Sequence, residues 1–405
     1  MNPTSDSSDC DKEVEVIAPI NIALVKYWGK RNENIVLPLN DSISLSINDV
    51  FTETRLRTGP SIKKDSVSIN GENISLSKHP RFLRCFNEVR RLIRKRATKS
   101  KNSRKRNPNP FSKFEVVSQT FFPIEAGLAS SAAGFAAVAY GLGKICHLDI
   151  KDTIRVARLG SGSACRSILS GLVHWKAGVA EDGTDCVCES VFEEDYWPTL
   201  RAIILVTSYD SKKVSSSIGM QLTVKTSELL QSRIKNVPGH IEKLKDAFRE
   251  KNFERFAEII MLESRQLHAV CLDTAPPLHY LNENSWHLMQ LVHSLNKFCN
   301  STTVAYTFDA GPNCCLFLES ENVPLMLAAL TKYCKLSSNL LDQLTSSSAA
   351  HQYKNLKSLV NEKQESLVLH EFAHAADCYT EPMEDVVKDI FLSAVGAGPS
   401  VKHSQ

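Results

Sequence analysis

Glycine, alanine and two serines are concentrated in one segment, PIEAGLASSAAG at positions 123–134, where a strand is expected to turn into a helix. Backbone N–H groups at a helix start can face a phosphate, and small side chains let a polyanion approach the backbone. The hydroxyls of Ser130 and Ser131 are suited to donate hydrogen bonds or to help hold Mg²⁺. The pattern indicates a phosphate-binding loop, although a tightly packed helix start would look the same. It matches neither the P-loop nor the dinucleotide-binding fingerprint.

Asp309 and Arg166 are candidates for catalysis. Asp309 follows an apolar strand and precedes Ala-Gly-Pro, so a turn at the strand end can hold its carboxylate in a cleft, unless it merely caps that turn. Arg166 ends the run GSGSACR, and its planar guanidinium suits bidentate binding of a carboxylate. A surface ion pair is the alternative for this arginine.

Four further segments carry a resemblance to a known family: APINIALVKYWGK at 18–30, GSGSACRS at 160–167, SSSIGM at 215–220 and AYTFDAGPN at 305–313. Together with the phosphate loop they resemble the mevalonate diphosphate decarboxylase family of the GHMP kinase superfamily. The resemblance runs from about position 14 to 317 and returns near 395–399. It implies an α+β, two-domain GHMP-kinase-like fold with the active site in the cleft between the domains.

The resemblance also implies an activity: ATP-dependent decarboxylation of (R)-5-diphosphomevalonate to isopentenyl diphosphate, in isoprenoid and sterol biosynthesis. A β-hydroxy acid has no carbonyl to receive the electrons that loss of CO₂ releases, and the sequence has no motif for a pyridoxal-type cofactor. Phosphorylation by ATP would turn the hydroxyl into a leaving group. ATP as co-substrate and Mg²⁺ are therefore implied. A GHMP kinase that stops after phosphorylation and a catalytically weakened binding protein stay open as alternatives.

The site residues follow from the same resemblance. Asp309 would contact the 3-hydroxyl as base or electrostatic stabiliser, Arg166 would hold the carboxylate, and Lys26 would lie near Asp309. ATP is expected at Gly127, Leu128, Ala129, Ser130, Ser131 and Ala132, with Ser130 or Ser131 as the Mg²⁺ ligand. The substrate is expected at Tyr27, Trp28, Gly29, Lys30, Arg81, Ser161, Gly162, Ser163, Ala164, Cys165, Arg166, Ser216 and Ser217.

Some of these residues also have a structural interpretation. Side chains alternate along a strand, so Trp28 could belong to the core instead. Ser161 and Ser163 could cap a helix, and Arg81 could be an ordinary surface residue. One departure from the family pattern is Glu125, which precedes the phosphate loop and would repel nucleotide phosphate unless it points away.

Hydrophobic periodicity predicts the elements that position these residues. Strands are expected within 14–50 and at 114–118, 172–175, 202–208, 303–308 and 314–319, and helices at 82–96, at 131–145, from 152, and across 219–298. An exposed loop is expected at 95–110. The domain boundary is expected near Trp197, which gives an N-terminal ATP-binding domain at 1–197 and a C-terminal domain at 198–405.

Composition limits the remaining classes. The 405 residues are 42% hydrophobic and 23% charged, as in an ordinary globular protein. The net charge of +3 is too small to attract nucleic acid or an anionic membrane by overall charge. Eight Lys or Arg between positions 94 and 106 would suit a nucleic-acid patch or nuclear signal, but no aromatic residue interleaves them. No signal peptide or long apolar run is visible, and the 12 cysteines form no C-x-x-C. We expect a cytoplasmic homodimer that binds neither nucleic acid nor membrane.

Overall fold

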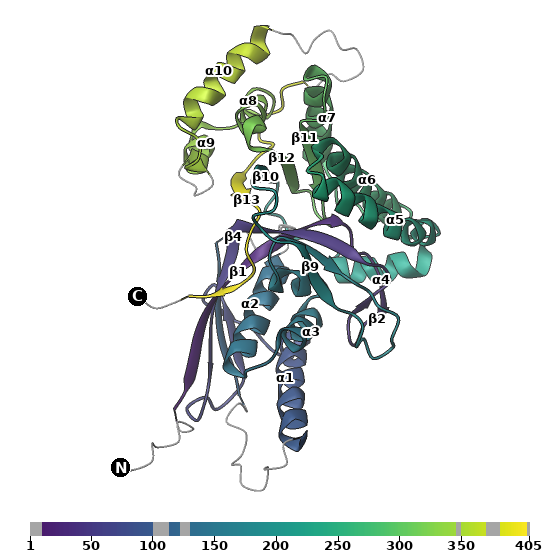
Figure 1. The fold of residues 1–405 in the computed structure, drawn as a ribbon, viewed down its shortest axis with the longest axis vertical. Coiled ribbons are helices and arrows are strands. Elements are labelled where there is room, and N and C mark those ends of the chain that lie inside the picture. Colours follow the sequence, from purple (N-terminus) through teal and green to yellow (C-terminus); the bar gives the residue numbers. More distant parts are fainter. Residues whose placement is uncertain (1–9, 100–112, 122–129, 346–349, 370–380, 403–405) are drawn as a thin grey trace.

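The computed structural model describes residues 10–99, 113–121, 130–345, 350–369 and 381–402 (Figure 1). The strands are β1 (Lys12–Val25), β2 (Lys30–Asn32), β3 (Leu37–Pro38), β4 (Ser42–Thr58), β5 (Ser66–Ile69), β6 (Glu72–Asn73), β7 (Glu115–Thr120), β8 (Leu172–Trp175), β9 (Cys188–Phe192), β10 (Leu200–Val206), β11 (Val304–Phe308), β12 (Cys314–Glu319), β13 (Asp389–Ala394) and β14 (Ser400–Val401).

The helices are α1 (Pro80–Lys99), α2 (Ser130–Ile145), α3 (Ile150–Gly160), α4 (Ser216–Thr226), α5 (Leu229–Arg249), α6 (Phe253–Leu272), α7 (Glu283–Phe298), α8 (Val323–Tyr333), α9 (Ser338–Thr345) and α10 (Leu356–Leu369). The described residues also include the 3₁₀ segments η2 (Gly162–Ile168) and η3 (Ser320–Asn322).

An eight-stranded sheet forms the lower part of Figure 1. Its order is β14-β1-β4-β7-β5-β6, and β8 and β9 extend from β4. β1 and β4 pair antiparallel with register shifts after Pro19 and after Ala23, which interrupt the long ladder. Helix α2 packs against β1 and β4, and its alanines and glycines are small enough to let it lie close to the sheet: a Cβ on Gly141 would be 3.5 Å from Leu56.

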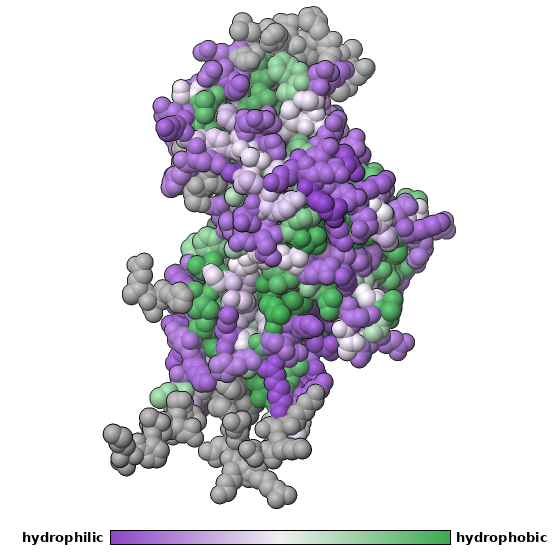
Figure 2. All heavy atoms as spheres, viewed as in Figure 1, coloured by the Kyte–Doolittle hydropathy of each residue, from purple (hydrophilic) through white to green (hydrophobic). Residues whose placement is uncertain are grey.

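A four-stranded antiparallel sheet, in the order β11-β12-β10-β13, forms the second part. Helices α5, α6 and α7 lie on one side of it (Figure 1). One hydrophobic core joins the two sheets, because it contains Ile20 and Leu45 of the first together with Ile203 and Phe317 of the second. On the face shown in Figure 2, hydrophilic residues predominate and hydrophobic ones form separate patches.

The end of the chain belongs to both sheets. β13 pairs with β10, and a few residues later β14 pairs with β1, with Val401 opposite Val16. The fold therefore has the expected mixture of helices and strands and is built from two parts. The boundary near Trp197 stays a prediction. Trp197 itself is buried in the shared core.

Most expected elements occur close to the predicted positions, with two exceptions. The first is the basic segment: helix α1 continues to Lys99, so the prediction of a loop from position 95 was wrong for 95–99. Arg96 explains part of this, because it donates hydrogen bonds to the carbonyl oxygen of His147 (2.6 Å) and to Asp152 (2.9 Å) and so ties this helix to α3. Residues 100–112 lie outside the described part.

The second exception concerns the burial of β4 and not its position. Serine alternates with apolar residues at its start, a pattern typical of a strand with one exposed face, yet Ser42, Ser44 and Ser46 are fully buried. No helix among the described residues is long and apolar enough to cross a membrane.

Candidate active site

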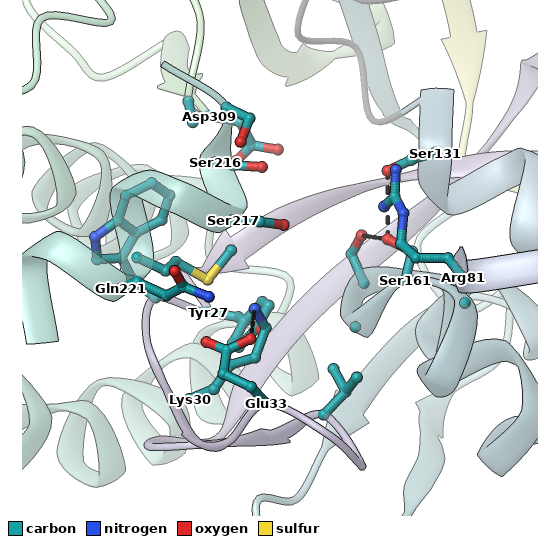
Figure 3. Close-up of a pocket in the computed structure, with 18 of the residues that line it drawn as sticks. Tyr27, Lys30, Glu33, Arg81, Ser131, Ser161, Ser216, Ser217, Gln221 and Asp309 are labelled. Atoms are coloured by element: carbon teal, nitrogen blue, oxygen red, sulfur yellow. Dashed lines mark hydrogen bonds and ion pairs between the residues drawn. The ribbon is translucent and has the colours of Figure 1, made fainter. Parts of the chain in front are cut away.

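A cavity of about 690 Å³ lies where the ends of β1 and β11, the starts of α1, α2 and α4, and the turn into η2 come together. In Figure 3, Asp309, Ser216 and Ser217 lie on one side of the open space, Ser131, Ser161 and Arg81 on the opposite side, and Tyr27, Lys30 and Glu33 on a third. Among the described residues its wall contains seven Lys or Arg side chains, Lys26, Lys30, Lys78, Arg81, Arg84, Arg166 and Lys212, and two acidic ones, Glu33 and Asp309. This excess of positive charge suits a polyanionic ligand.

Lys26 and Asp309 form an ion pair between the two parts of the fold. The Lys26 ammonium, 2% exposed, donates to Oδ1 of Asp309 over 2.6 Å, whereas the Asp309 side chain remains 34% exposed. Burial raises the pKa of Asp309, but the charge and hydrogen bond of Lys26 and the charge of Arg166 outweigh it, so the pKa lies below its usual value. Asp309 is therefore an ionised carboxylate at neutral pH.

The turn after β11 fixes Asp309. The N–H of Gly311 donates to the Asp309 carbonyl oxygen over 2.8 Å. The side chain of Asn313 accepts hydrogen bonds from the backbone N–H groups of Thr207 (2.7 Å) and Ser208 (3.2 Å), which ties this turn to the end of β10. The carboxylate is thus attached to a rigid sheet edge.

Arg166 is 2% exposed and lines the cavity. Its Nε and Nη1 donate to neutral oxygens only, namely Ser44 Oγ (3.0 Å), Asn21 Oδ1 (3.3 Å) and Ser42 Oγ (2.8 Å). Burial lowers its pKa, and the nearby Asp309 opposes this change. Within the described ranges no carboxylate lies within ion-pair distance of Arg166. A buried guanidinium without a carboxylate partner is suited to bind an anionic ligand.

The serines around η2 form a short row of hydroxyls. Ser131 Oγ lies 3.3 Å from Ser161 Oγ, which lies 3.5 Å from Ser163 Oγ, and all three residues line the cavity. Between them, Gly162 lets the ring of Tyr27 approach, because a Cβ there would be 3.0 Å from a Tyr27 ring carbon. The expected positions Ser131, Ser161, Gly162 and Ser163 are therefore brought together.

Tyr27 and Lys30 lie on the third side. The Tyr27 hydroxyl is buried and has no hydrogen-bond partner among the described residues, and burial raises its pKa well above the usual value. It is thus a protonated donor. Lys30, almost fully buried, donates to Glu33 Oε2 over 2.8 Å. Both residues line the cavity, as the sequence predicts.

Trp28 is only 3% exposed, although it also contributes to the cavity wall. Its Nε1 donates to Thr223 Oγ1 over 3.0 Å, and its ring packs edge-on against Tyr280. Gly29 has φ of +98°, and a Cβ there would be 2.7 Å from Leu39, so a side chain at this position would be strained. Trp28 therefore packs beneath the cavity wall as a support for α4, to which it is hydrogen-bonded through Thr223.

Helix α4 presents its first residues to the cavity. Ser216 and Ser217 lie in its first turn, where free N–H groups and the helix dipole favour an anion, and Ser215 caps the helix by accepting from the N–H of Ile218. Across the cavity, Arg81 occupies the first turn of α1 and stacks over Phe135 at 5.1 Å.

Other predicted residues lie elsewhere. Ala132, Ala164 and Cys165 are fully buried and are not in the cavity wall, and the last two belong to the core of the first part. Gly127, Leu128, Ala129 and Glu125 lie outside the described residues, as does the side chain of Ser130.

Several wall residues were not predicted. Lys78 and Arg84 lie three positions before and after Arg81, so a search for basic residues near Arg81 would have found them. Lys212 precedes the SSSIGM segment and could have been found in the same way. Asn21 lies inside the segment at 18–30, but only the fold shows that it accepts from Arg166 and donates to Ser167 Oγ over 2.7 Å.

Metal binding by protein groups alone finds no support in the described ranges, which contain no cluster of three or more His, Cys, Asp or Glu that could hold a metal ion. The cavity instead offers serine hydroxyls and many cations. A divalent ion would fit there if phosphate oxygens of a bound nucleotide supplied most of its ligands.

Comparisons with known proteins agree with this geometry. Residues 18–188 match the diphosphomevalonate decarboxylase-like N-terminal domain, and residues 202–402 match the mevalonate 5-diphosphate decarboxylase C-terminal domain. The chain is 43% identical to diphosphomevalonate decarboxylase of Bos taurus over 323 residues, which cover 78% of this chain and 79% of the relative. The chain belongs to the mevalonate diphosphate decarboxylase family.

Other members of the mevalonate diphosphate decarboxylase family give similar results. The Saccharomyces cerevisiae enzyme is 42% identical over 322 residues, 78% of this chain and 80% of that one. The solved structure of mevalonate diphosphate decarboxylase from Trypanosoma brucei superimposes with a TM-score of 0.82 at 32% identity, covering 97% of this chain and 98% of that chain.

Proposed function

We propose that the cavity catalyses ATP-dependent decarboxylation of (R)-5-diphosphomevalonate to isopentenyl diphosphate, a reaction of the mevalonate pathway. The observation that carries this proposal is the arrangement of Arg166 and Asp309 in one cationic cavity. Arg166 is a buried cation without a carboxylate partner among the described residues, and Asp309 is a partly exposed anion held by Lys26. Such a pair suits a ligand with both a carboxylate and a hydroxyl.

The other wall residues are assigned to the rest of the substrate. Tyr27 and Lys30 would bind the diphosphate from one side, Arg81 from another, and Ser216 and Ser217 from the start of α4. Hydroxyls and ammonium groups are the usual ligands of phosphate oxygens. The release of Lys30 from Glu33 would accompany this binding.

Ser161 and Ser163, close to Arg166 in the chain, would bind substrate oxygens between the reacting centre and the phosphate loop. Arg166 would hold the carboxylate with its guanidinium. The Arg166 Nε already donates to Ser44 and Nη1 already donates to Ser42. The side chain therefore need not reorganise when substrate arrives.

The reaction then has two steps. The 3-hydroxyl oxygen of the substrate attacks the γ-phosphorus of ATP, so that a new O–P bond forms and the bond to ADP breaks. The hydroxyl proton passes to an oxygen of the transferred phosphoryl group or to water. The C3–O bond then breaks and phosphate leaves with the electron pair. The electrons of the C1–C2 bond form the C2=C3 double bond, and CO₂ departs.

Asp309 would act on the first step through its charge. Because Lys26 keeps its pKa below the usual value, the carboxylate is a weak base towards an alcohol. An ionised carboxylate beside the hydroxyl orients it and stabilises the positive character that develops there. The low pKa therefore favours the electrostatic role of Asp309 over that of a strong general base.

ATP and Mg²⁺ are proposed as co-substrate and cofactor. The solved structure of MDDEF in complex with MVAPP, AMPPCP and magnesium is 27% identical to this chain and superimposes with a TM-score of 0.70, covering 98% of this chain and 100% of that one. In this chain Ser131 would contact nucleotide phosphate or the ion, together with Ser130 and the preceding loop. Mg²⁺ would neutralise phosphate charge, which helps the attack on phosphorus.

The domains, assembly and location are proposed as well. We place the boundary near Trp197, with the ATP-binding part before it and the second part after it, apart from β14, which returns to the first sheet. A cytoplasmic homodimer is proposed from the family resemblance. Light scattering of the purified protein would measure its mass, and a mass of one chain would refute the dimer.

One coupled assay tests the function. The purified protein is supplied with (R)-5-diphosphomevalonate, ATP and Mg²⁺, and ADP, phosphate, CO₂ and isopentenyl diphosphate are measured. Equal amounts of all four products are expected. ADP without CO₂ would indicate a kinase that stops after phosphorylation, and absence of all four would refute the proposed activity.

A further inference from the structure

The main chain of Lys26 is held by side chains from the second part of the fold. Glu263 on α6 accepts a hydrogen bond from the Lys26 N–H at 2.9 Å, and Arg233 on α5 donates to the Lys26 carbonyl oxygen, also at 2.9 Å. The two peptide groups that flank the Lys26 Cα are therefore both bound by side chains of the second part, while Asn40 of the first part also donates to the carbonyl oxygen at 3.1 Å. Neither Glu263 nor Arg233 is part of the cavity wall.

Glu263 is the centre of this arrangement. It is 0% exposed, and besides Lys26 it accepts from Arg233 Nη2 at 2.5 Å and lies 2.6 Å from His240 Nδ1. Burial raises the pKa of Glu263, but Arg233, the His240 hydrogen bond and the Lys26 N–H outweigh it, so the pKa is lower than usual. The carboxylate therefore remains ionised in the interior.

Such a group is difficult to explain by stability alone. A buried ion pair often contributes no more than well-packed apolar residues of the same volume, because both charges lose their hydration. The Glu263 and Arg233 side chains, however, both form hydrogen bonds with the main chain of one residue of the first part, Lys26. That residue is the partner of Asp309.

Lysine has a long flexible side chain, so the position of its ammonium depends on where its Cα is fixed. The Lys26 side chain is 2% exposed and reaches Asp309 over 2.6 Å. A displacement of about 1 Å in a catalytic group can reduce the rate about 100-fold. Movement of the Lys26 backbone would thus change the distance between its ammonium and the Asp309 carboxylate.

We propose that Glu263 and Arg233 are positioning residues that hold the backbone of Lys26 so that its ammonium stays on Asp309. The inference rests on the proposed function, because it assigns the Lys26–Asp309 pair to catalysis. It adds residues that lie outside the cavity and act only through Lys26.

A double-mutant cycle tests this role. Glu263→Gln keeps the size of the side chain but removes the charge that holds Arg233, and Lys26→Met removes the ammonium. Glu263→Gln alone should lower kcat at least about 10-fold while KM for (R)-5-diphosphomevalonate changes less than about 3-fold. In the Lys26→Met background the same change should have no further effect on kcat. An equal loss in both backgrounds, or a kcat within twofold of wild type for Glu263→Gln, would overturn the proposal.

Glu88 supplies a matched control. It is also a buried carboxylate between two arginines, Arg91 and Arg155, but it lies on α1 away from the cavity wall. Glu88→Gln should lower thermal stability and leave kcat unchanged. If Glu263→Gln does not fold, Arg233→Lys tests the same contact, and a kcat within twofold of wild type for a folded Arg233→Lys would contradict the inference.

A second readout does not depend on turnover. The titration of Asp309 can be followed by NMR of protein with ¹³C-labelled aspartate carboxyls, assigned by loss of the signal in Asp309→Asn. In Glu263→Gln the Asp309 titration should move upward toward its ordinary value, because Lys26 would no longer be held against it. An unchanged titration would refute the positioning role. Failure of wild-type protein to decarboxylate would instead refute the proposed function and leave this measurement intact.

Discussion

The ammonium of Lys26 lies 2.6 Å from the carboxylate of Asp309, and the two residues follow strands of different sheets. This contact joins the two parts of the protein at the place where the proposed chemistry occurs. A change in the relative position of the sheets would change the distance between the two charges, and with it the pKa of Asp309. The pair is therefore the most direct target for mutation.

Asp309→Asn should reduce turnover at least about 100-fold, because the amide has about the same size but neither the charge nor the ability to take a proton. Binding of (R)-5-diphosphomevalonate should change little, since other residues hold its carboxylate and diphosphate. Steady-state turnover and calorimetric substrate affinity on one preparation check this. Asp385→Asn, at an exposed carboxylate, is the control. Turnover within a few-fold of wild type would make Asp309 only a turn residue.

Arg166→Lys should lower kcat/KM at least about 10-fold, equivalent to about 1.4 kcal/mol of transition-state stabilisation. A lysine keeps the charge but cannot form the bidentate contact or reach Ser42 and Ser44 at the same time. The measurement is steady-state kinetics with Arg255→Lys, an exposed arginine, as the matched change. Near-normal kinetics would remove Arg166 from the site.

Ser130→Ala and Ser131→Ala test whether the start of α2 binds ATP. At least one should raise KM for ATP about 10-fold, as expected when a hydrogen bond of about 1.5 kcal/mol to a charged group is lost. Affinity for (R)-5-diphosphomevalonate should stay nearly constant. Ser301→Ala, at an exposed serine, serves as control. If both variants keep the wild-type KM for ATP, the start of α2 does not bind the nucleotide.

Glu125→Ala tests the departure from the family pattern. Removal of an anion cannot weaken phosphate binding electrostatically, so ATP affinity should stay the same or improve. Nucleotide titration of the wild type and the variant measures it. A clear loss of affinity would show that Glu125 holds Mg²⁺ or the loop.

His268 predicts how stability depends on pH. Burial, together with the charge of Lys26, lowers its pKa to about 4 from an ordinary 6.5. The unfolded chain therefore takes up a proton between these values while the folded protein does not, so stability falls as pH falls from 6.5 to about 4. The contribution of this group is on the order of 3 kcal/mol.

Urea unfolding at pH 7.5 and at pH 4.5 measures that effect. His268→Gln, which does not titrate, should lose less stability on acidification than wild type does. His351→Gln, at an exposed histidine, should behave like wild type. An unchanged pH dependence in His268→Gln would show that another group is responsible.

The sequence predicts the local features of this protein well. Apolar periodicity placed β1, β4, α2 and the pair β11 and β12 near their observed positions, because each pattern depends on neighbouring residues. The residues that bind Arg166 could not be predicted in this way. Ser42 and Ser44 alternate with apolar residues as on an exposed face, and only the packing of η2 against β4 makes them buried acceptors.

The support of Lys26 was unpredictable for the same reason. Glu263 lies on a long amphipathic helix, where an acidic residue normally faces solvent. Its burial depends on Arg233 from another helix and on a backbone N–H more than two hundred positions earlier in the chain. Long-range hydrogen bonds of this kind leave no periodic signal.

The pairing of β14 with β1 has a consequence for how the protein is made. Val16 leaves the ribosome 385 residues before Val401, so that edge of the sheet stays open until Val401 has been made. Until then β1 offers a free row of backbone groups that a chaperone or a second nascent chain can occupy. Because β13 joins the other sheet only a few residues earlier in the chain, one short segment completes both sheets.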